Sequence, residues 1–543
     1  MCNAQEQTIL FGGSIRTMAG SGVAEAVLIE DGKIKVVGSL SDCRARACAD
    51  PVMKDLGGQC MMPGFIDVHT HPLMLGMTNV WADLSWPGVS SIDQLVRALK
   101  TEAETLSGNE SVCGFGFDWR RMADNRMPTA RDLDRVATDR PVHIMHASGH
   151  YNVINSFYMD QLGITAATPD PEGGVVGRYA DGAPNGQLQD AACDLLTGPD
   201  GVKVRNHGPN LHMPDPMERL LEYVLVGQMD YLKAGITTVV DVQVTKREAR
   251  AYLAARDRGL LKMRVVMMYL SSQLGHMEAL GLAFCLGDLK VSAGPVKLYA
   301  DGSLTAGSAY FNEPYAHDPG YYGYTYHRPE ELKALIIRAH EMGIQTATHA
   351  QGEAAIQIVL DAVAEGQAKV RQKDIRHRIE HCGLPTEAQV AVMKDLDIWP
   401  VPQPQHVYQY GEGVVDAVGE KGKNYSPYGW FLKHGVPVVL SSDAPVVRAN
   451  PLEAVYAAVT RKTAAGNTLG ADRHCISLED ALKGYTVTAA RATHREAHLG
   501  SLEPGKQADM VILDQDPFHA DIEALPQIAV TETWVAGKPV YNK

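Results

Sequence analysis

Short apolar runs alternate with amphipathic helical stretches along most of the chain, from residue 62 onward. The helical stretches repeat apolar residues at three- and four-residue spacing, as in PEELKALIIRAHEMG and TEAQVAVMKDL. The apolar runs have the length of buried strands, and we expect strands at 62–71, 235–242, 263–270, 294–302, 343–350, 375–382, 397–404 and 436–445. Strand–helix alternation predicts parallel pairing with right-handed crossovers. Eight such strands predict an α/β fold, a (β/α)8 TIM-like barrel.

Both ends of the chain have a different pattern, with short strands and turns. AEAVLIEDGKIKVVG has two apolar runs around Asp31 and Gly32, which is a strong hairpin signal. IAVTETWVAGKPVYN has the same pattern of two apolar runs, with a turn near Gly537. We therefore expect one small β-sandwich domain built from both ends, and we assign 1–61 plus 496–543 to it and 62–495 to the barrel. Two unrelated β extensions are the alternative.

Two long segments interrupt the barrel pattern. Residues 72–234 are too long for one crossover and contain their own helical and strand patterns, so we expect an inserted subdomain after the first strand. Residues 303–327 follow the fourth strand and are rich in glycine and tyrosine, including Tyr322. A long loop after a barrel strand lies on the catalytic face, so this loop either roofs a pocket or packs as an ordinary surface loop.

Composition limits the partners. The 543-residue chain has a formal net charge of −14, which argues against a nucleic-acid partner because phosphate binding needs a basic face. Its nine cysteines form no C-x-x-C pair, and we expect no secretory signal at the N-terminus. No window approaches the ~20 apolar residues of a spanning helix. We expect a cytoplasmic protein that acts on a small molecule without a membrane partner, and a homodimer only because large barrels in general form them.

Residues that can bind a metal recur at the C-terminal ends of the expected strands, which meet on the active face of a barrel. They are His69 and His71 in the first strand, Lys297 in the fourth, His349 in the fifth, His381 in the sixth and Asp443 in the eighth. Side chains alternate along a strand, so both histidines of an H-x-H pair point the same way and can reach one ion. A lone histidine at a strand end is more often structural, but this many at matching ends indicate a metal site. Zinc is the first choice, with manganese, iron or nickel as alternatives.

Six segments resemble, in order, the signature segments of the amidohydrolase superfamily, with the closest resemblance to its branch of N-substituted formamide deformylase-like enzymes. They are PGFIDVHTH, VKLYADGSL, THAQGEAA, RHRIEH, LSSDAPV and LGSLEPGKQADMVILDQDP. The resemblance covers the chain from about residue 8 to the C-terminus. It implies that the metal ligands and the catalytic aspartate of the family correspond to His69, His71, His349, His381 and Asp443.

The resemblance also implies a role for Lys297. In related enzymes the lysine of strand four carries a CO₂-derived carbamate that bridges two metals. An ammonium group cannot ligate a metal, whereas a carbamate offers two anionic oxygens. We expect two divalent metals if Lys297 is carbamylated, and one if it is a plain salt-bridging lysine.

The expected chemistry is hydrolysis of a C–N bond in an amide, N-acyl or N-formyl compound. A metal lowers the pKa of bound water towards ~7, which makes hydroxide available at neutral pH. Asp443 would accept the proton of this water and pass it to the leaving amine. His150 in the insertion resembles a family histidine that faces the site, and His406 follows the seventh strand. With Tyr322, these two histidines are the candidate substrate contacts.

Departures from the family pattern concern the pocket. Residues 305–307 read Thr-Ala-Gly where the family has a small-Ser-Arg stretch, which weakens the case for a carboxylate-bearing substrate; Glu353 and Ser148 replace aspartates. Alternatives on this scaffold are a deaminase, a cyclic-amide hydrolase, and an esterase or lactonase. Deaminases of the superfamily usually lack the strand-four lysine, which argues against the first. A non-catalytic binding or regulatory protein would have lost ligands, and none is lost here.

Overall fold

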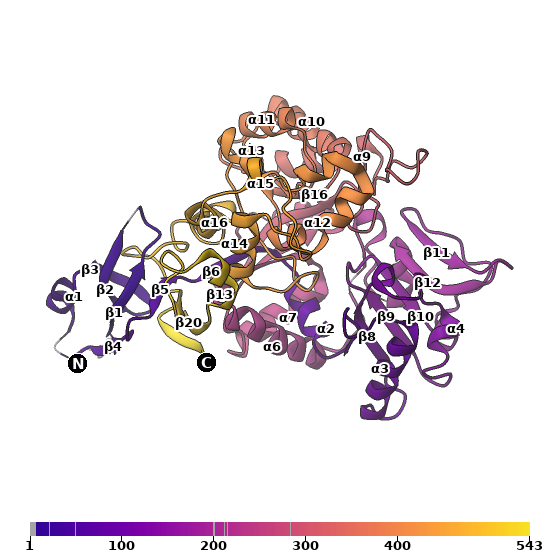
Figure 1. Ribbon diagram of the computed structural model, residues 1–543, viewed down its shortest axis with the longest axis horizontal. Helices are drawn as coiled ribbons and strands as arrows, with labels where there is room; N and C mark the ends of the chain where they lie inside the picture. Colours follow the sequence, from indigo (N-terminus) through magenta and orange to yellow (C-terminus); the bar gives the residue numbers. More distant parts are fainter. Residues whose placement is uncertain are drawn as a thin grey trace.

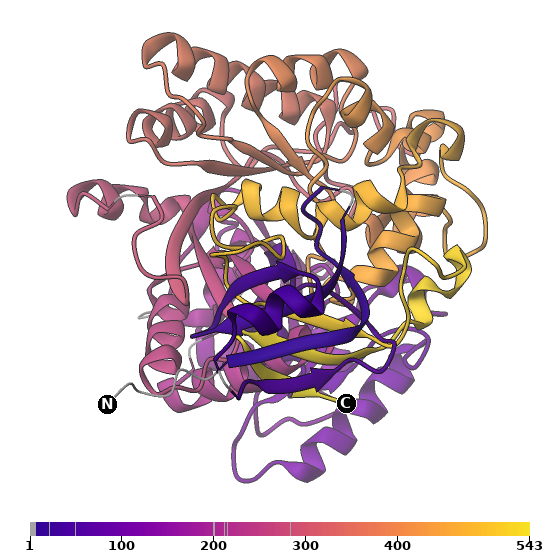
Figure 2. The ribbon, with the colours of Figure 1, turned by 90° about the vertical axis from the view of Figure 1, so that its left-hand side faces the viewer.

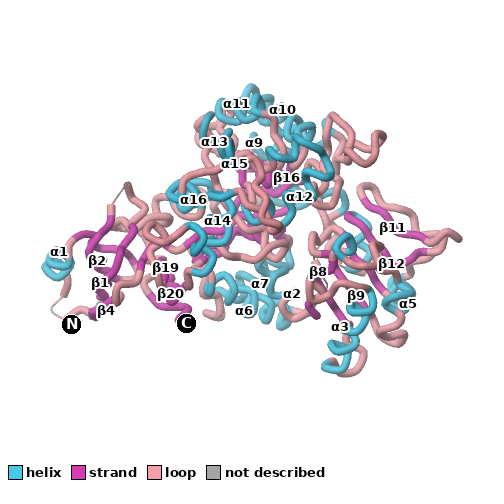
Figure 3. Tube along the Cα trace, viewed as in Figure 1, coloured by secondary structure: helices cyan, strands magenta, loops and turns pink. Residues whose placement is uncertain are grey.

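The computed structural model describes residues 7–20, 22–48, 50–198, 201–210, 212–213, 215–282 and 284–543. Strands in this part of the chain form three sheets. Figures 1 and 3 show a central sheet flanked on one side by a sheet from the two chain ends and on the other side by a sheet of the segment after the first central strand. The first six residues of the expected terminal domain, and residues 199, 200, 211 and 214 of the expected insertion, lie outside the described residues.

The central sheet consists of seven parallel strands that form a nearly closed, barrel-like wall. In spatial order they are β6 (Phe65–Thr70), β13 (Ile236–Val244), β14 (Arg264–Leu270), β15 (Val291–Tyr299), β16 (Thr346–Ala350), β17 (Arg378–His381) and β18 (Trp399–Val401). Nearly all of their residues are buried, as expected of a parallel sheet covered on both faces. Because the strands are parallel, their C-terminal ends meet at one face of the barrel.

Seven of the eight expected strands are present, and the prediction of a strand at 436–445 is wrong. The N–H of Asp443 donates to the carbonyl of His69 in β6 (2.8 Å), and the Ser441 hydroxyl donates to the carbonyl of Pro402 just after β18 (3.3 Å). The segment therefore runs between the two edge strands of the barrel. It forms no regular strand ladder, and the left-handed φ of 64° at Asp443 breaks the extended conformation that a ladder needs.

Helices connect the parallel strands and pack outside them. They are α2 (Pro72–Thr78), α6 (Met217–Lys233), α7 (Lys246–Asp257), α8 (Leu274–Ala279), α9 (Pro329–Glu341), α10 (Glu353–Lys369), α11 (Glu387–Asp395), α12 (Pro404–Val418), α13 (Tyr428–Lys433), α14 (Pro451–Thr460), α15 (Ala471–His474), α16 (Leu478–Gly484) and α17 (Val487–Ala492). Capping boxes begin α7 and α11, where a threonine and the residue three positions later satisfy each other's backbone N–H groups. Among the described residues, no helix combines the length and apolarity needed to cross a membrane.

Strands from both ends of the chain join one sheet, as Figure 2 shows for the indigo and yellow strands. They are β1 (Gln7–Arg16), β2 (Val23–Glu30), β3 (Lys33–Gly38), β4 (Val52–Asp55), β5 (Cys60–Pro63), β19 (Met510–Leu513), β20 (Val530–Val535) and β21 (Lys538–Asn542), with α1 (Leu40–Arg46) beside them. Both predicted hairpins are confirmed, and antiparallel pairing of β5 with β19 connects the two ends. A buried ion pair between Asp509 and Arg264 of β14 fastens this sheet to the barrel (2.6 Å).

The segment after β6 contains the third sheet. Its strands are β7 (Ala82–Asp83), β8 (Val112–Phe117), β9 (Val142–His146), β10 (Tyr151–Ile154), β11 (Gly174–Arg178) and β12 (Pro184–Asp190), and its helices are α3 (Ile92–Thr105), α4 (Ala130–Leu133) and α5 (Ser156–Leu162). Helix α3 buries one apolar face against this sheet, which gives the segment an apolar core of its own. The turn between β9 and β10 carries His150 towards the barrel.

Candidate metal centre

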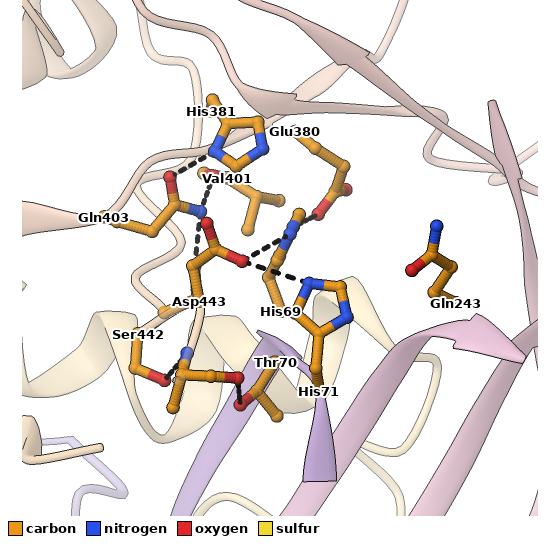
Figure 4. A network of polar contacts seen from close by, with 12 residues as sticks. His69, Thr70, His71, Gln243, Glu380, His381, Val401, Gln403, Ser442 and Asp443 are labelled. Carbon is orange, nitrogen blue, oxygen red and sulfur yellow. Dashed lines mark hydrogen bonds and ion pairs between the residues drawn. The ribbon is translucent and has the colours of Figure 1, made fainter. Parts of the chain in front are cut away.

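The two histidines of the H-x-H pair meet the same carboxylate. His69 lies in β6 and His71 directly follows it, and the Nε2 atom of each is 3.3 Å from Oδ1 of Asp443 (Figure 4). All three residues are at least nine-tenths buried. The period-two geometry of a strand thus directs both imidazoles into one site, as the sequence predicts.

Two further histidines approach Asp443 from other elements. His381 ends β17 and His406 lies in the first turn of α12, and one ligand atom from each of the two lies within 4.8 Å of the other and of a carboxylate oxygen of Asp443. The Nε2 of His406 is 3.7 Å from Oδ2 of Asp443, and neither of its ring nitrogens has a hydrogen-bond partner although the side chain is buried. Unpartnered buried nitrogens beside a carboxylate are the arrangement expected where a bound group completes a site.

His349 and Lys297 complete the ring of predicted ligands. His349 lies in β16, and its ring stacks on Tyr299 of β15 (5.2 Å between centroids) and lies 4.5 Å from the ring of His381. Its Nε2 donates to the carbonyl of Gly302 (3.1 Å). Lys297 is fully buried in β15, and its Nζ lies 4.7 Å from the centroid of the Tyr299 ring. The structure therefore brings together all six predicted metal-binding side chains.

Burial strongly affects the ionisation of the predicted ligands. It lowers the pKa of His71, and it holds the pKa of His349 and His381 well below the ordinary value. Burial also lowers the pKa of Lys297 to about 8, although nearby Glu380 and Asp443 favour its charged form. Burial opposes ionisation of Asp443, but the adjacent histidines outweigh it and hold its pKa well below the usual range. Near neutral pH the site therefore offers neutral imidazoles at His71, His349 and His381 and an anionic carboxylate at Asp443.

A second layer of charged and polar groups holds the histidines in place. Glu380 accepts hydrogen bonds from Arg378 (2.7 and 2.8 Å) and pairs with Nδ1 of His69. All three are buried, and the interactions with Arg378 and His69 outweigh burial and lower the pKa of Glu380 to about 2. Gln403 orients His381 in the same way, because its Oε1 is 2.7 Å from Nδ1 of His381. Each support occupies Nδ1 and leaves Nε2 for a ligand role.

The backbone at the site is unusual at two of the predicted ligands. His381 and Asp443 have φ values of 67° and 64°, a left-handed conformation that costs a non-glycine residue about 1–3 kcal/mol. Asp67 supports this turn, because it accepts from both the N–H and the hydroxyl of Ser442. Burial raises the pKa of Asp67 to about 6. Such backbone geometry is concentrated at functional sites, where the surrounding structure enforces it.

One cavity contains the predicted ligands together with His150. Its lining residues are His69, His71, Ser148, His150, Pro209, Lys297, Tyr299, Ser303, Thr305, His349, Gln351, His381, His406, Asp443 and Val446. Tyr322 is not among them, and 42 % of its surface is exposed, so the structure does not bring this predicted substrate contact to the site. A larger cavity of about 620 Å³ lies between α2, α6 and residues 445–450, but none of the predicted ligands lines it.

The fold and this site define a class of enzyme. The sequence profile of the amidohydrolase family matches residues 53–541, and the chain belongs to this family. It is 29% identical over 544 residues to the N-substituted formamide deformylase of Arthrobacter pascens, with 98% of each chain covered. It is also 29% identical to the putative amidohydrolase YtcJ of Bacillus subtilis (strain 168), covering 99% of this chain and 100% of that one. Among solved structures, an uncharacterized metal-dependent hydrolase from Pyrococcus horikoshii OT3 matches with a TM-score of 0.79 at 26% identity, covering 95% of this chain and 99% of that one.

Proposed function

We propose that this amidohydrolase cleaves the C–N bond of an amide, an N-acyl amine or an N-formyl amine with the help of a divalent metal. The observation that carries the proposal is the buried carboxylate of Asp443, which faces His69, His71, His381 and His406 in one cavity. The name of the Arthrobacter relative, a deformylase of N-substituted formamides, supports this class of substrate.

The donor set fits a transition metal. We assign the ligands to His69, His71, Lys297, His349, His381 and Asp443. Metal ligation needs neutral imidazole, which burial favours here, and an anionic carboxylate, which the histidines favour. Nitrogen donors with carboxylate oxygen suit zinc first, and manganese, iron or nickel next. When bound, such an ion supplies Lewis-acid activation of the attacking water and of the substrate carbonyl.

Lys297 decides whether one or two ions bind. Carbamate formation requires the neutral amine, and the pKa of about 8 leaves a usable neutral fraction near pH 7. The histidines and Asp443 lie within the same cavity, so a carbamate on Lys297 would add two anionic oxygens among them. We therefore propose a carbamylated Lys297 and a two-metal site.

Asp443 is the proposed proton carrier. Its depressed pKa keeps it ionised, so it can take a proton from the attacking water. The same carboxyl then returns that proton to the amine nitrogen as the C–N bond breaks. His150 and His406 line the cavity and are the proposed substrate contacts.

We further propose the division into a terminal domain at 1–61 plus 496–543 and a catalytic part at 62–495 that includes the insertion 72–234. Pairing of β5 with β19 supports the joint terminal domain. The separate apolar core between α3 and its sheet supports the insertion.

A substrate screen tests the proposed function. Zinc- or manganese-loaded protein is assayed against N-formyl, N-acyl, ester and cyclic-amide compounds. We expect hydrolysis of N-formyl or N-acyl amines that is lost on chelation and restored by the metal. Hydrolysis restricted to esters or lactones would overturn the C–N assignment while leaving the metal site untouched.

A further inference from the structure

A buried carboxylate joins the insertion to the tyrosine-rich loop at the edge of the catalytic cavity. Asp190, the last residue of β12, is 1% exposed, and its Oδ1 lies 2.7 Å from Nδ1 of His150. The hydroxyl of Tyr326 donates to the same oxygen (2.7 Å), and that of Tyr324 donates to Oδ2. His150 lines the cavity, whereas Asp190 lies behind it. Asp190 therefore contacts His150, a residue that lines the cavity, without lining the cavity itself.

These contacts fix which nitrogen of His150 carries a proton. Burial opposes ionisation of Asp190, but His150 and the two tyrosine hydroxyls outweigh it and lower the pKa of this carboxyl. An ionised carboxylate only accepts hydrogen bonds, so Nδ1 of His150 must be the donor. The Nε2 atom is then the nitrogen left for the cavity.

The backbone also holds this pair together. The N–H of Asp190 donates to the carbonyl of His150 (2.9 Å), so both the side chains and the main chains are linked. Asp190 has φ 50° and ψ −117°, a conformation that residues other than glycine rarely adopt. Such a conformation persists where the surroundings enforce it, and it is concentrated at functional sites.

The protonation state of His150 decides what Nε2 does. In the proposed function the cavity holds at least one divalent cation, which supplies the positive charge that polarises the substrate carbonyl. A neutral imidazole with its proton on Nδ1 presents a lone pair at Nε2, which accepts a hydrogen bond.

We infer that Asp190 is a positioning residue that holds Nε2 of His150 as an acceptor for the N–H of a secondary amide. This inference rests on the proposed function and narrows it to a substrate class. A secondary amide has an N–H to donate, whereas an ester and an N-methylated amide have none. The site therefore selects secondary amides, because the lone pair of a buried Nε2 would otherwise be left without a donor.

Discrimination between matched substrates tests the inference. The metal-loaded enzyme is assayed with N-phenethylformamide, its N-methyl derivative and phenethyl formate. We compare wild type with His150→Ala and Asp190→Asn; the carboxamide introduced by the second substitution can donate to Nδ1 and so move the ring proton to Nε2. In both variants we expect kcat/KM for the secondary amide to fall about 10- to 100-fold relative to kcat/KM for the ester.

The control is Asp181→Asn, the same substitution at an exposed aspartate of the same insertion, which should leave the amide-to-ester ratio unchanged. If Asp190→Asn does not fold, His150→Ala alone decides, because it removes the acceptor and leaves the carboxylate in place. An equal loss for amide and ester in the folded variants would overturn the inference and leave only a structural role. Failure of wild type to hydrolyse any of the three compounds would instead refute the proposed function, and the inference with it.

Discussion

The buried ion pair behind His69 makes a quantitative prediction for Glu380→Gln. The pKa of Glu380 is lowered from 4.5 to about 2, which corresponds to about 3 kcal/mol of stabilisation at neutral pH. The same substitution leaves the guanidinium of Arg378 buried without its anionic partner, and breaking such a pair costs about 3–5 kcal/mol. The two arguments together predict that Glu380→Gln lowers the free energy of unfolding by about 3–5 kcal/mol at pH 7.

The pH dependence has a definite sign. The pKa of Glu380 is depressed in the folded state, so its contribution is fully present above about 4.5 and is lost as the pH falls towards 2. The difference between wild type and Glu380→Gln should therefore shrink below pH 4.5. His69 also loses its anionic support, so the metal dissociation constant should rise about 10- to 100-fold.

Denaturant unfolding followed by circular dichroism, with a metal titration of each protein, provides the assay. Glu387→Gln is the matched control, because Glu387 is a surface glutamate that pairs with Lys433 and should tolerate the change. Equal free energies of unfolding for Glu380→Gln and Glu387→Gln at pH 7 would refute the reasoning. A difference in the free energy of unfolding between wild type and Glu380→Gln that persists unchanged below pH 4.5 would also refute it.

Three further predictions concern other residues. Asp443→Asn should abolish turnover while most of the metal is retained, as measured by kcat and metal analysis; substantial residual turnover would show that another group is the base. Lys297→Ala should reduce the bound metal from two equivalents to one, and native mass spectrometry of the wild type should detect the carbamate; two equivalents in the variant would contradict the bridging role. Asp509→Asn leaves Arg264 buried without its anionic partner, so the free energy of unfolding should fall by about 3–5 kcal/mol, and an unchanged denaturation midpoint would contradict this.

Residues at strand ends could be predicted because the periodicity of a strand fixes where they point. His69, His71, His349 and His381 each follow or end a buried apolar run, so their convergence follows once the strands are parallel. Asp443 is also in the site, but its segment is not a strand. The left-handed backbone at Asp443 is a tertiary effect that the apolar pattern of the segment does not report.

The supporting groups were harder to predict. Arg378 and Glu380 flank Ile379 in a strand whose residues are all buried, and two charges at this spacing in such a strand are a signal that sequence reasoning could have used. Asp190 lies 40 residues from His150, and no local pattern connects them. Among the tyrosines of the loop, composition does not say which ones point inward. Tyr326 is 2% exposed and reaches Asp190, whereas Tyr322 is largely at the surface.

The central claim is that His69 and His71 hold a divalent metal that the reaction requires. Metal analysis of the purified protein after chelation and reconstitution, together with hydrolysis of an N-formyl amine, tests it most directly when wild type is compared with the double variant His69→Ala/His71→Ala. We predict at least one equivalent of tightly bound metal and metal-dependent hydrolysis in wild type, and the loss of both in a folded double variant. A folded double variant that still binds the metal and hydrolyses the substrate would contradict the account.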